Sequence, residues 1–201
     1  MKIKKILVFV YIISLCSCSS EIFENEQDLW TYLKETENGY LQQKKINRYD
    51  FSLLSMPTDL LVIQELGEDR SKVKIKKLRD KYKKYMYFTL SISRDSKELL
   101  SAAPKTRQEF GEMVNQLAFG MKEKVHLFTQ KKDTLTMLDY NYPRMYGMSQ
   151  STSILFVYPR EKKYLKEGVL NFTIQDIGTY TGEVRFKIDV NQIKKQLRLK
   201  L

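Results

Sequence analysis

Apolar and charged residues alternate strictly near the C-terminal end of the chain. Between residues 182 and 190 the apolar positions are Val184, Phe186, Ile188 and Val190, and every position between them is charged. Because neighbouring side chains of a strand point to opposite faces, this pattern predicts a half-buried strand. Weaker alternation, bounded by turn residues, predicts further strands over 40–46, 49–55, 85–93, 122–130, 133–142, 152–158 and 168–176, and an edge strand over 196–201.

A different spacing predicts helices. Residues 106–121 begin with Thr106 and Glu109, which match a capping box, and Phe110, Met113, Val114 and Leu117 form one apolar stripe. Shorter helices are predicted over 26–36, 57–66 and 70–84. In the last of these, Ile75, Leu78, Tyr82 and Tyr85 share a stripe.

The order of these elements indicates the fold class. Helices are expected mainly in the first 120 residues and consecutive strands after them, which predicts an α+β fold. An antiparallel sheet is expected in the C-terminal half, with a sandwich-like arrangement as one option. No internal repeat or long Gly/Ser/Pro linker divides the chain, so a single folded domain is expected.

The first fifteen residues differ from the rest. Residues 1–5 carry three lysines, and residues 6–15 form an apolar run with Ser14 as its one strongly polar position. A basic start, a short apolar run and small residues after it are typical of a secretory signal peptide. As a helix the run would span only about 15 Å, roughly half of a bilayer core, so a permanent membrane span is the poorer interpretation.

The residues that follow the run, Leu15-Cys16-Ser17-Cys18, resemble the lipobox of bacterial lipoproteins. Cys18 fits the obligatory cysteine, with Leu15 three positions before it and Ser17 one before it, whereas Cys16 would have bulky Leu15 at the cut. The resemblance implies cleavage after Ser17 and acylation of Cys18. Several acyl chains together would hold the protein firmly in a membrane. The mature chain would then have no free thiol and no intrachain disulfide.

This interpretation divides the chain into three parts: a cleaved signal peptide over 1–17, an acidic tether over 18–26 and one α+β domain over 27–201. Acidic residues are frequent just behind Cys18, and such residues resemble an export signal for the outer face of the outer membrane. A solvated tether leading into a helix is the alternative. Ser19 and Ser20 lack the aspartate of inner-membrane retention. We therefore expect attachment to the bacterial outer membrane, on its periplasmic or cell-surface face.

The residues that usually carry catalysis are sparse. His126 is the one histidine, and two cysteines without a second pair or nearby histidines do not complete a zinc shell. The chain contains no glycine-rich phosphate loop, and Ser149 lacks the setting of a nucleophile elbow. We expect no catalytic residues, no metal, no cofactor and no enzyme activity, although a dispersed carboxylate pair leaves a hydrolase as a lesser alternative.

The strongest candidate for a partner contact is a basic segment. The chain has a formal net charge of +11, and residues 70–84 contain nine basic residues against one acid. The basic residues are Arg70, Lys72, Lys74, Lys76, Lys77, Arg79, Lys81, Lys83 and Lys84. Either they form the solvated face of a surface helix, or they contact an anionic lipid, glycan or protein of the envelope. Nucleic acid is not expected, because the leader removes the chain from the cytoplasm.

A second candidate surface is rich in tyrosine. Residues 138–148 contain Tyr140, Tyr142, Arg144 and Tyr146, residue types that are enriched at binding surfaces. Packing within a sheet is the alternative for such tyrosines.

Three classes of function fit these observations. The first is a non-catalytic, lipid-anchored accessory or docking component of an envelope or secretion assembly. The second is a surface-exposed binding module for a glycan, lipid or host protein, and the third is an unrecognised hydrolase. The fold class does not choose among them.

Replacing Cys18 with Ser tests the anchor directly. Because serine has no thiol to acylate, Cys18→Ser is expected to move the protein from the membrane fraction to the soluble fraction, measured by fractionation and immunoblotting. Cys16→Ser is the matched control and is expected to stay with the membranes. If Cys18→Ser also stays with the membranes, the lipoprotein interpretation is wrong.

Overall fold

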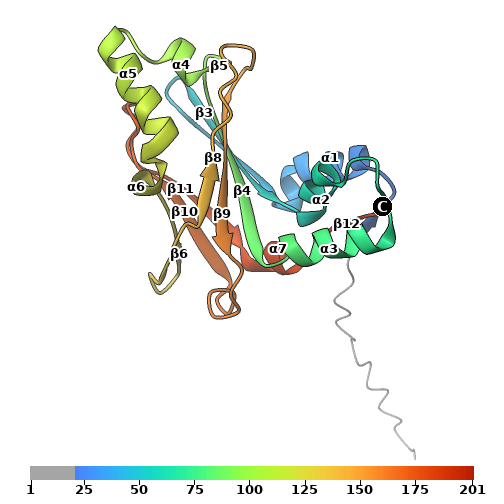
Figure 1. Ribbon diagram of the computed structural model, residues 1–201. Coiled ribbons are helices and arrows are strands. Elements are labelled where there is room, and N and C mark those ends of the chain that lie inside the picture. Colours follow the sequence, from blue (N-terminus) through green and yellow to red (C-terminus); the bar gives the residue numbers. More distant parts are fainter. Residues whose placement is uncertain (1–20) are drawn as a thin grey trace, which may run out of the picture.

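The computed structural model describes residues 21–201, which form two antiparallel sheets and one short parallel pair of strands (Figure 1). The larger sheet has the order β2-β3-β4-β9-β8, and β5 pairs with β4. Its strands are β2 (Leu41–Ile46), β3 (Tyr49–Met56), β4 (Tyr85–Arg94), β5 (Lys97–Glu98), β8 (Asp139–Asn141) and β9 (Thr152–Pro159). Every second residue of β3 and β9 is buried, so one face of this sheet faces the core.

The smaller sheet has the order β11-β10-β6-β7. Its strands are β6 (Val125–Thr129), β7 (Thr134–Leu135), β10 (Val169–Ile174) and β11 (Val184–Asp189). Val184, Phe186 and Ile188 are buried, and the charged residues between them are exposed. The alternation read from the sequence is therefore confirmed in β11.

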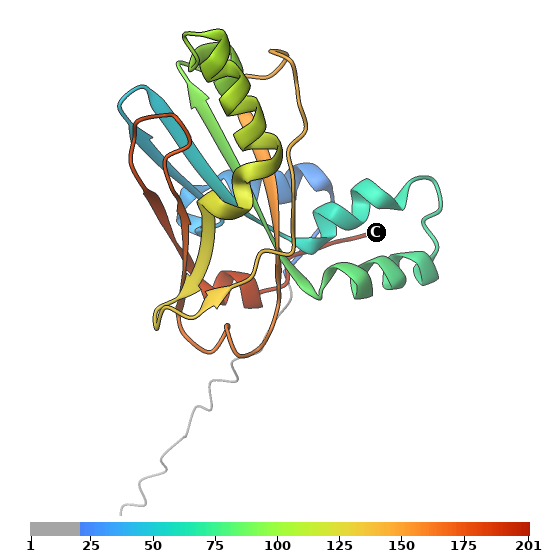
Figure 2. The ribbon, with the colours of Figure 1, turned by 60° about the vertical axis from the view of Figure 1, so that its left-hand side comes forward.

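The inner faces of the two sheets enclose one apolar core. Phe88 of β4 and Phe156 of β9 both pack on Phe172 of β10, with ring centroids 6.0 and 5.7 Å apart. A continuous helical stretch lies beside the sheets and consists of α5 (Arg107–Asn115), a π-helical segment η2 (Gln116–Gly120) and α6 (Met121–Lys124) (Figure 2). Met113 and Leu117 of this stretch are buried in the same core.

The remaining elements form a separate layer at one end of the sheets, where the C-terminus also lies (Figure 1). They are β1 (Ile22–Phe23), α1 (Glu26–Lys34), η1 (Thr36–Asn38), α2 (Thr58–Leu66), α3 (Lys72–Tyr82) and β12 (Arg198–Leu199). Two smaller apolar clusters hold this layer together. The short helices α4 (Leu99–Ala102) and α7 (Val190–Lys194) complete the fold. No helix in residues 21–201 is long and apolar enough to cross a membrane.

The structure confirms the α+β class and most of the predicted elements. It also assigns the strands of the first half to a sheet: β4 pairs along its length with β9, from Tyr85↔Pro159 to Ile92↔Thr152. The sandwich is therefore built from both halves of the chain. The predicted C-terminal edge strand exists as β12, but it pairs in parallel with β1 at the start of the fold.

Four of the predictions from the sequence are wrong. The strand predicted over 133–142 is two short strands, β7 in the smaller sheet and β8 in the larger one. Phe110 is 46% exposed rather than buried, because it lies in the first turns of α5, which project beyond the sheets (Figure 1). Tyr85 is not part of the α3 stripe, because α3 ends at Tyr82 and Tyr85 begins β4. The acidic segment is not a free tether from Glu21 onward. The Glu21 carbonyl accepts a hydrogen bond from the Arg198 N–H, and its carboxylate lies 2.6 Å from Lys195 Nζ.

A buried ion pair joins the elements of the end layer. The Arg79 guanidinium of α3 donates two hydrogen bonds to the Asp59 carboxylate of α2, at 3.0 and 2.6 Å. Arg79 also donates to the Leu199 carbonyl, and the Leu199 N–H donates to Asp59, both at 2.8 Å. Because Asp59 is almost fully buried, every one of these partners is needed to offset the loss of its hydration.

Arg79→Met tests this pair. The variant leaves the Asp59 carboxylate buried without its cation, and we expect the free energy of unfolding to fall by about 3–5 kcal/mol, measured by urea denaturation. The double variant Asp59→Asn, Arg79→Met removes the stranded charge and is expected to be more stable than Arg79→Met alone. As a control, Lys45→Met breaks the exposed Lys45–Asp50 pair and is expected to change stability far less. A loss as small as that of Lys45→Met would contradict this account.

Candidate functional site

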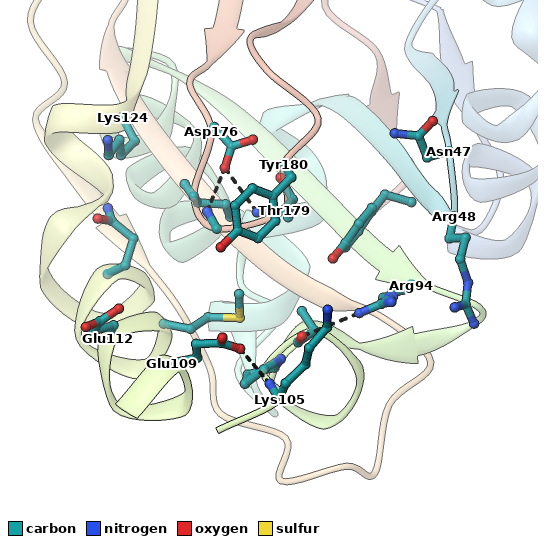
Figure 3. Close-up of a pocket in the computed structure, with 17 residues that line it drawn as sticks. Asn47, Arg48, Arg94, Lys105, Glu109, Glu112, Lys124, Asp176, Thr179 and Tyr180 are labelled. Carbon is teal, nitrogen blue, oxygen red and sulfur yellow. Dashed lines mark hydrogen bonds between the residues drawn. The ribbon is translucent and has the colours of Figure 1, made fainter. Parts of the chain in front are cut away.

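A cleft of about 520 Å³ opens at the end of the molecule that carries α5. Five segments line it: the β2–β3 turn, the end of β4, the α4–α5 connection, the helical stretch from α5 into η2, and the β10–β11 loop. Figure 3 shows their side chains converging from both sheets and from the helix. None of these segments forms the site alone.

One carboxylate orders the β10–β11 loop. Asp176 Oδ1 accepts hydrogen bonds from the N–H groups of Gly178 and Thr179, and Oδ2 accepts from Thr181 and Gly182, at 2.7–3.1 Å. Partial burial raises the pKa of Asp176, but the backbone N–H donors outweigh this effect, and the net pKa lies below the ordinary carboxyl value. The loop is therefore held around an ionised carboxylate.

This loop presents Tyr180 to solvent. Tyr180 is 87% exposed and has a φ of +56°, a left-handed conformation that side-chain-bearing residues rarely adopt. The exposed ring gains little free energy from burial, and the left-handed backbone conformation costs free energy. Local strain of this kind occurs at binding sites. Tyr180 lines the cleft and lies beside Asp176 and Thr179 in Figure 3.

Arg94 closes the side of the cleft formed by β4. Its guanidinium lies 5.6 Å from the centre of the Tyr49 ring, and Nη1 donates to the carbonyl of Ala102 at 2.8 Å. Its Nε is buried and has no hydrogen-bond partner within residues 21–201. Such groups are uncommon in folded proteins.

Gln116 lines the cleft where the helical stretch changes to π-helix. Its side-chain amide lies over Gly120, and a Cβ added at Gly120 would stand 2.5 Å from Nε2. Because Gly120 has no Cβ, the Gln116 amide can occupy the space beside it. Nε2 of Gln116 is a second buried donor without a partner in the described part of the chain.

The lining carries charges of both signs. Its cations are Arg48, Arg94, Lys105 and Lys124, and its carboxylates are Glu109, Glu112 and Asp176. Several are already engaged: Arg48 pairs with Asp95, Glu109 accepts from the Lys105 N–H, and Glu112 accepts from Gln108. Such a lining disfavours the binding of a ligand that carries only negative charge or only positive charge. It suits a ligand whose polar groups both donate and accept, such as a polyhydroxylated one.

The described residues do not assemble a metal centre. Within residues 21–201 no three His, Cys, Asp or Glu side chains come close enough to hold an ion. His126 lies outside the cleft, half-buried on β6, with Nε2 3.4 Å from Gln175 Nε2.

The predicted basic segment forms α3, but its nine residues have different environments. Arg79 is used internally by Asp59, and Lys74 Nζ donates to the Leu66 carbonyl at the end of α2. Lys81 pairs with Glu65, and Lys83 with Asp80. The other five, Arg70, Lys72, Lys76, Lys77 and Lys84, are exposed, and their side chains make no hydrogen bond or ion pair within residues 21–201.

The predicted tyrosine surface is divided. Tyr140 lies in β8 and stacks on Phe156 of the core, and burial raises the pKa of Tyr142. Only Arg144 and Tyr146 are exposed, with the guanidinium 5.8 Å from the ring centre. Cys18, the predicted lipidation site, lies outside the described residues.

No local pattern in the sequence indicates the cleft as a whole, because its lining comes from five separate segments. One local signal was available: Asp176 is followed by Gly178, Thr179, Thr181 and Gly182, a composition typical of a carboxylate-capped turn. The unused donors of Arg94 and Gln116 leave no trace in the sequence.

Comparisons with known proteins add little. No family model matches the chain, and no curated protein matches it. A Burkholderia pseudomallei protein of unknown function matches its structure with a TM-score of 0.40 and 11% identity, covering 85% of this chain and 88% of that one. A DUF4426 family protein from Pseudomonas aeruginosa matches with a TM-score of 0.37 and 10% identity, covering 75% and 93%. Similarity at this level carries no argument about function.

The order of the β10–β11 loop is expected to depend on pH. The folded-state pKa of Asp176 lies below its ordinary value of 3.8, so its contribution is complete above that value and is lost as the pH falls through the folded-state pKa. NMR of the Gly178 and Gly182 amides should show their hydrogen-bonded shifts collapse in this acidic range. In Asp176→Asn the acidic transition of these amides should be absent. An unchanged transition in that variant would contradict the assignment.

Proposed function

We propose that this chain is a non-catalytic lipoprotein of the bacterial outer membrane, anchored through Cys18, that docks onto a larger envelope or secretion assembly. The observation that carries the proposal is the separation between two ends of the molecule. The chain enters the fold at the end that carries β1, β12 and the basic helix α3, and exposed binding features lie at the other end (Figure 1).

The anchored end would lie close to the membrane. The fold begins at Glu21, three residues after Cys18, and three extended residues reach about 10 Å. Strand β4 runs from Tyr85, which follows α3, to Arg94 at the cleft. Nine steps of about 3.3 Å give a separation of about 30 Å between these two levels.

The distal end offers a contact surface for a protein. The loop between β8 and β9 exposes Met145, Tyr146 and Met148, with Tyr146 79% exposed. The Gly147 N–H donates to the buried Glu98 carboxylate at 2.8 Å, which fixes the loop to the end of the large sheet. We name Met145, Tyr146 and Met148 the tip loop. Methionine and tyrosine are enriched at protein interfaces, so the tip loop supports docking.

The cleft supports a second candidate, a binding module for a saccharide. Sugar hydroxyls both donate and accept hydrogen bonds, which suits a lining of mixed sign, and the exposed Tyr180 ring offers a face for stacking. A hydrolase is the weaker alternative, because two of the three cleft carboxylates accept backbone N–H hydrogen bonds and the third accepts one from Gln108.

Affinity purification of the acylated protein from its own membranes tests docking. A membrane-protein partner is expected in stoichiometric amount, and the triple variant Met145→Ser, Tyr146→Ser, Met148→Ser is expected to recover about tenfold less of it. Phe119→Ser removes an equally exposed apolar side chain from the helical stretch, and it is expected to retain the partner. Recovery of the protein alone, with saccharide bound, would instead support the second candidate.

A further inference from the structure

A basic groove of about 300 Å³ lies between α3 and β12, at the end where the chain enters the fold. Lys72, Lys76 and Arg79 of α3 and Lys83, the C-cap residue of this helix, line one side of it. Their spacing of four, three and four residues places them on a single helical face. Arg198 of β12 lines the opposite side. The groove is therefore lined by only those basic residues of the segment that share one helical face.

The cations of the groove outnumber its carboxylates. Asp59 and Asp80 are its two acidic side chains, and they pair with Arg79 and Lys83. Lys72 and Lys76 make no side-chain hydrogen bond or ion pair with another residue of 21–201. Arg198 donates only to Gln196, at 3.1 Å. Lys72, Lys76 and Arg198 thus keep their charge available to a ligand.

The groove also lies beside the entering chain. Ile22 of β1 pairs with Arg198 in the parallel ladder, so the segment that leads back to Cys18 leaves the fold beside Arg198. Two exposed apolar side chains lie on the same elements, Ile22 at 63% and Val73 of α3 at 80% exposure. Free cations next to exposed apolar side chains are typical of surfaces that lie on a membrane interface.

We infer that this groove binds the phosphate headgroups of acidic phospholipids, so that the protein lies with α3 and β12 against the membrane. The inference deepens the proposed function and rests on the anchor at Cys18. With about 10 Å of chain between Cys18 and Glu21, the groove is within reach of the headgroup layer. The positive groove and the negative headgroups are complementary, which selects this occupant over a neutral one.

The lysines of the opposite face do not take part. Lys74 and Lys81 point to α2, where they contact the Leu66 carbonyl and the Glu65 carboxylate. Arg70, Lys77 and Lys84 are exposed but do not line the groove, so the inferred contact is assigned to Lys72, Lys76 and Arg198.

Lysine footprinting on vesicles tests the inference. The acylated protein is reconstituted in phosphatidylcholine vesicles with or without phosphatidylglycerol, treated with an amine reagent and analysed by mass spectrometry. Labelling of Lys72 and Lys76 is expected to fall several-fold when phosphatidylglycerol is present, and high salt should restore it. Labelling of Lys97 and Lys131, which are exposed elsewhere, should not change.

Charge reversal supplies the matched comparison. At low ionic strength, where charge attraction is strongest, the Cys18→Ser protein without acyl chains should sediment with phosphatidylglycerol vesicles, although it is released from membranes at physiological salt. Adding Lys72→Glu and Lys76→Glu should weaken this partitioning at least tenfold, whereas Lys97→Glu and Lys131→Glu should weaken it much less. Equal losses for the two pairs, or equal labelling of Lys72 and Lys76 in both vesicle types, would overturn the inference. So would protection of these lysines by an envelope protein extract but not by phosphatidylglycerol.

Different experimental results would refute the anchor at Cys18 and the lipid-binding groove. An intact mass without acyl chains would refute the anchor, while sedimentation would still report on the groove. Membrane loss on Cys18→Ser, combined with unchanged footprints of Lys72 and Lys76, would refute the groove and keep the anchor.

Discussion

The buried contact between Asp59 and Arg79 holds the end layer of this protein in place. It joins α2 to α3 through side chains, and it joins both helices to β12 through the backbone of Leu199. Since β12 in turn pairs with β1, one carboxylate fixes the basic helix relative to the point where the chain enters. Together with the apolar packing of Ile75 and Leu78 on α2, this contact sets the position of Lys72 and Lys76 beside Arg198.

The sandwich and the end layer are stabilised by different kinds of interaction. The sandwich depends on aromatic and aliphatic side chains that interdigitate between two sheets, such as Phe88, Phe156 and Phe172. The end layer has smaller apolar clusters and relies more on hydrogen bonds and charge. The distal end shows a third pattern, in which a loop is ordered by a single carboxylate, Asp176. The surfaces proposed for binding at both ends thus lie on short segments supported by the sandwich.

The sequence predicted elements well where a local period was strong. Val184, Phe186 and Ile188 follow the two-residue period of a strand, and Thr106 caps α5 as expected. The prediction from sequence was wrong where packing against neighbouring elements decides burial. Phe110 fits a helical stripe, but its side chain is exposed because no neighbouring element covers it. The pairing of β4 with β9, across about sixty residues, and the five-segment cleft depend on contacts that no local pattern encodes. For the basic segment, composition identified the charges, but only the structure showed that Arg79 is used internally.

The parallel pairing of β1 with β12 has a consequence for the order of folding. The first strand of the described chain has the last strand as its partner, so β1 cannot pair until residues 198 and 199 have been synthesised. Asp59 and Arg79 likewise lack the Leu199 backbone groups until that moment. The sandwich strands up to β11 are complete earlier, and such a long closure is slow because its entropy must be lost before contacts form. The end layer is therefore expected to complete its contacts after the sandwich has formed.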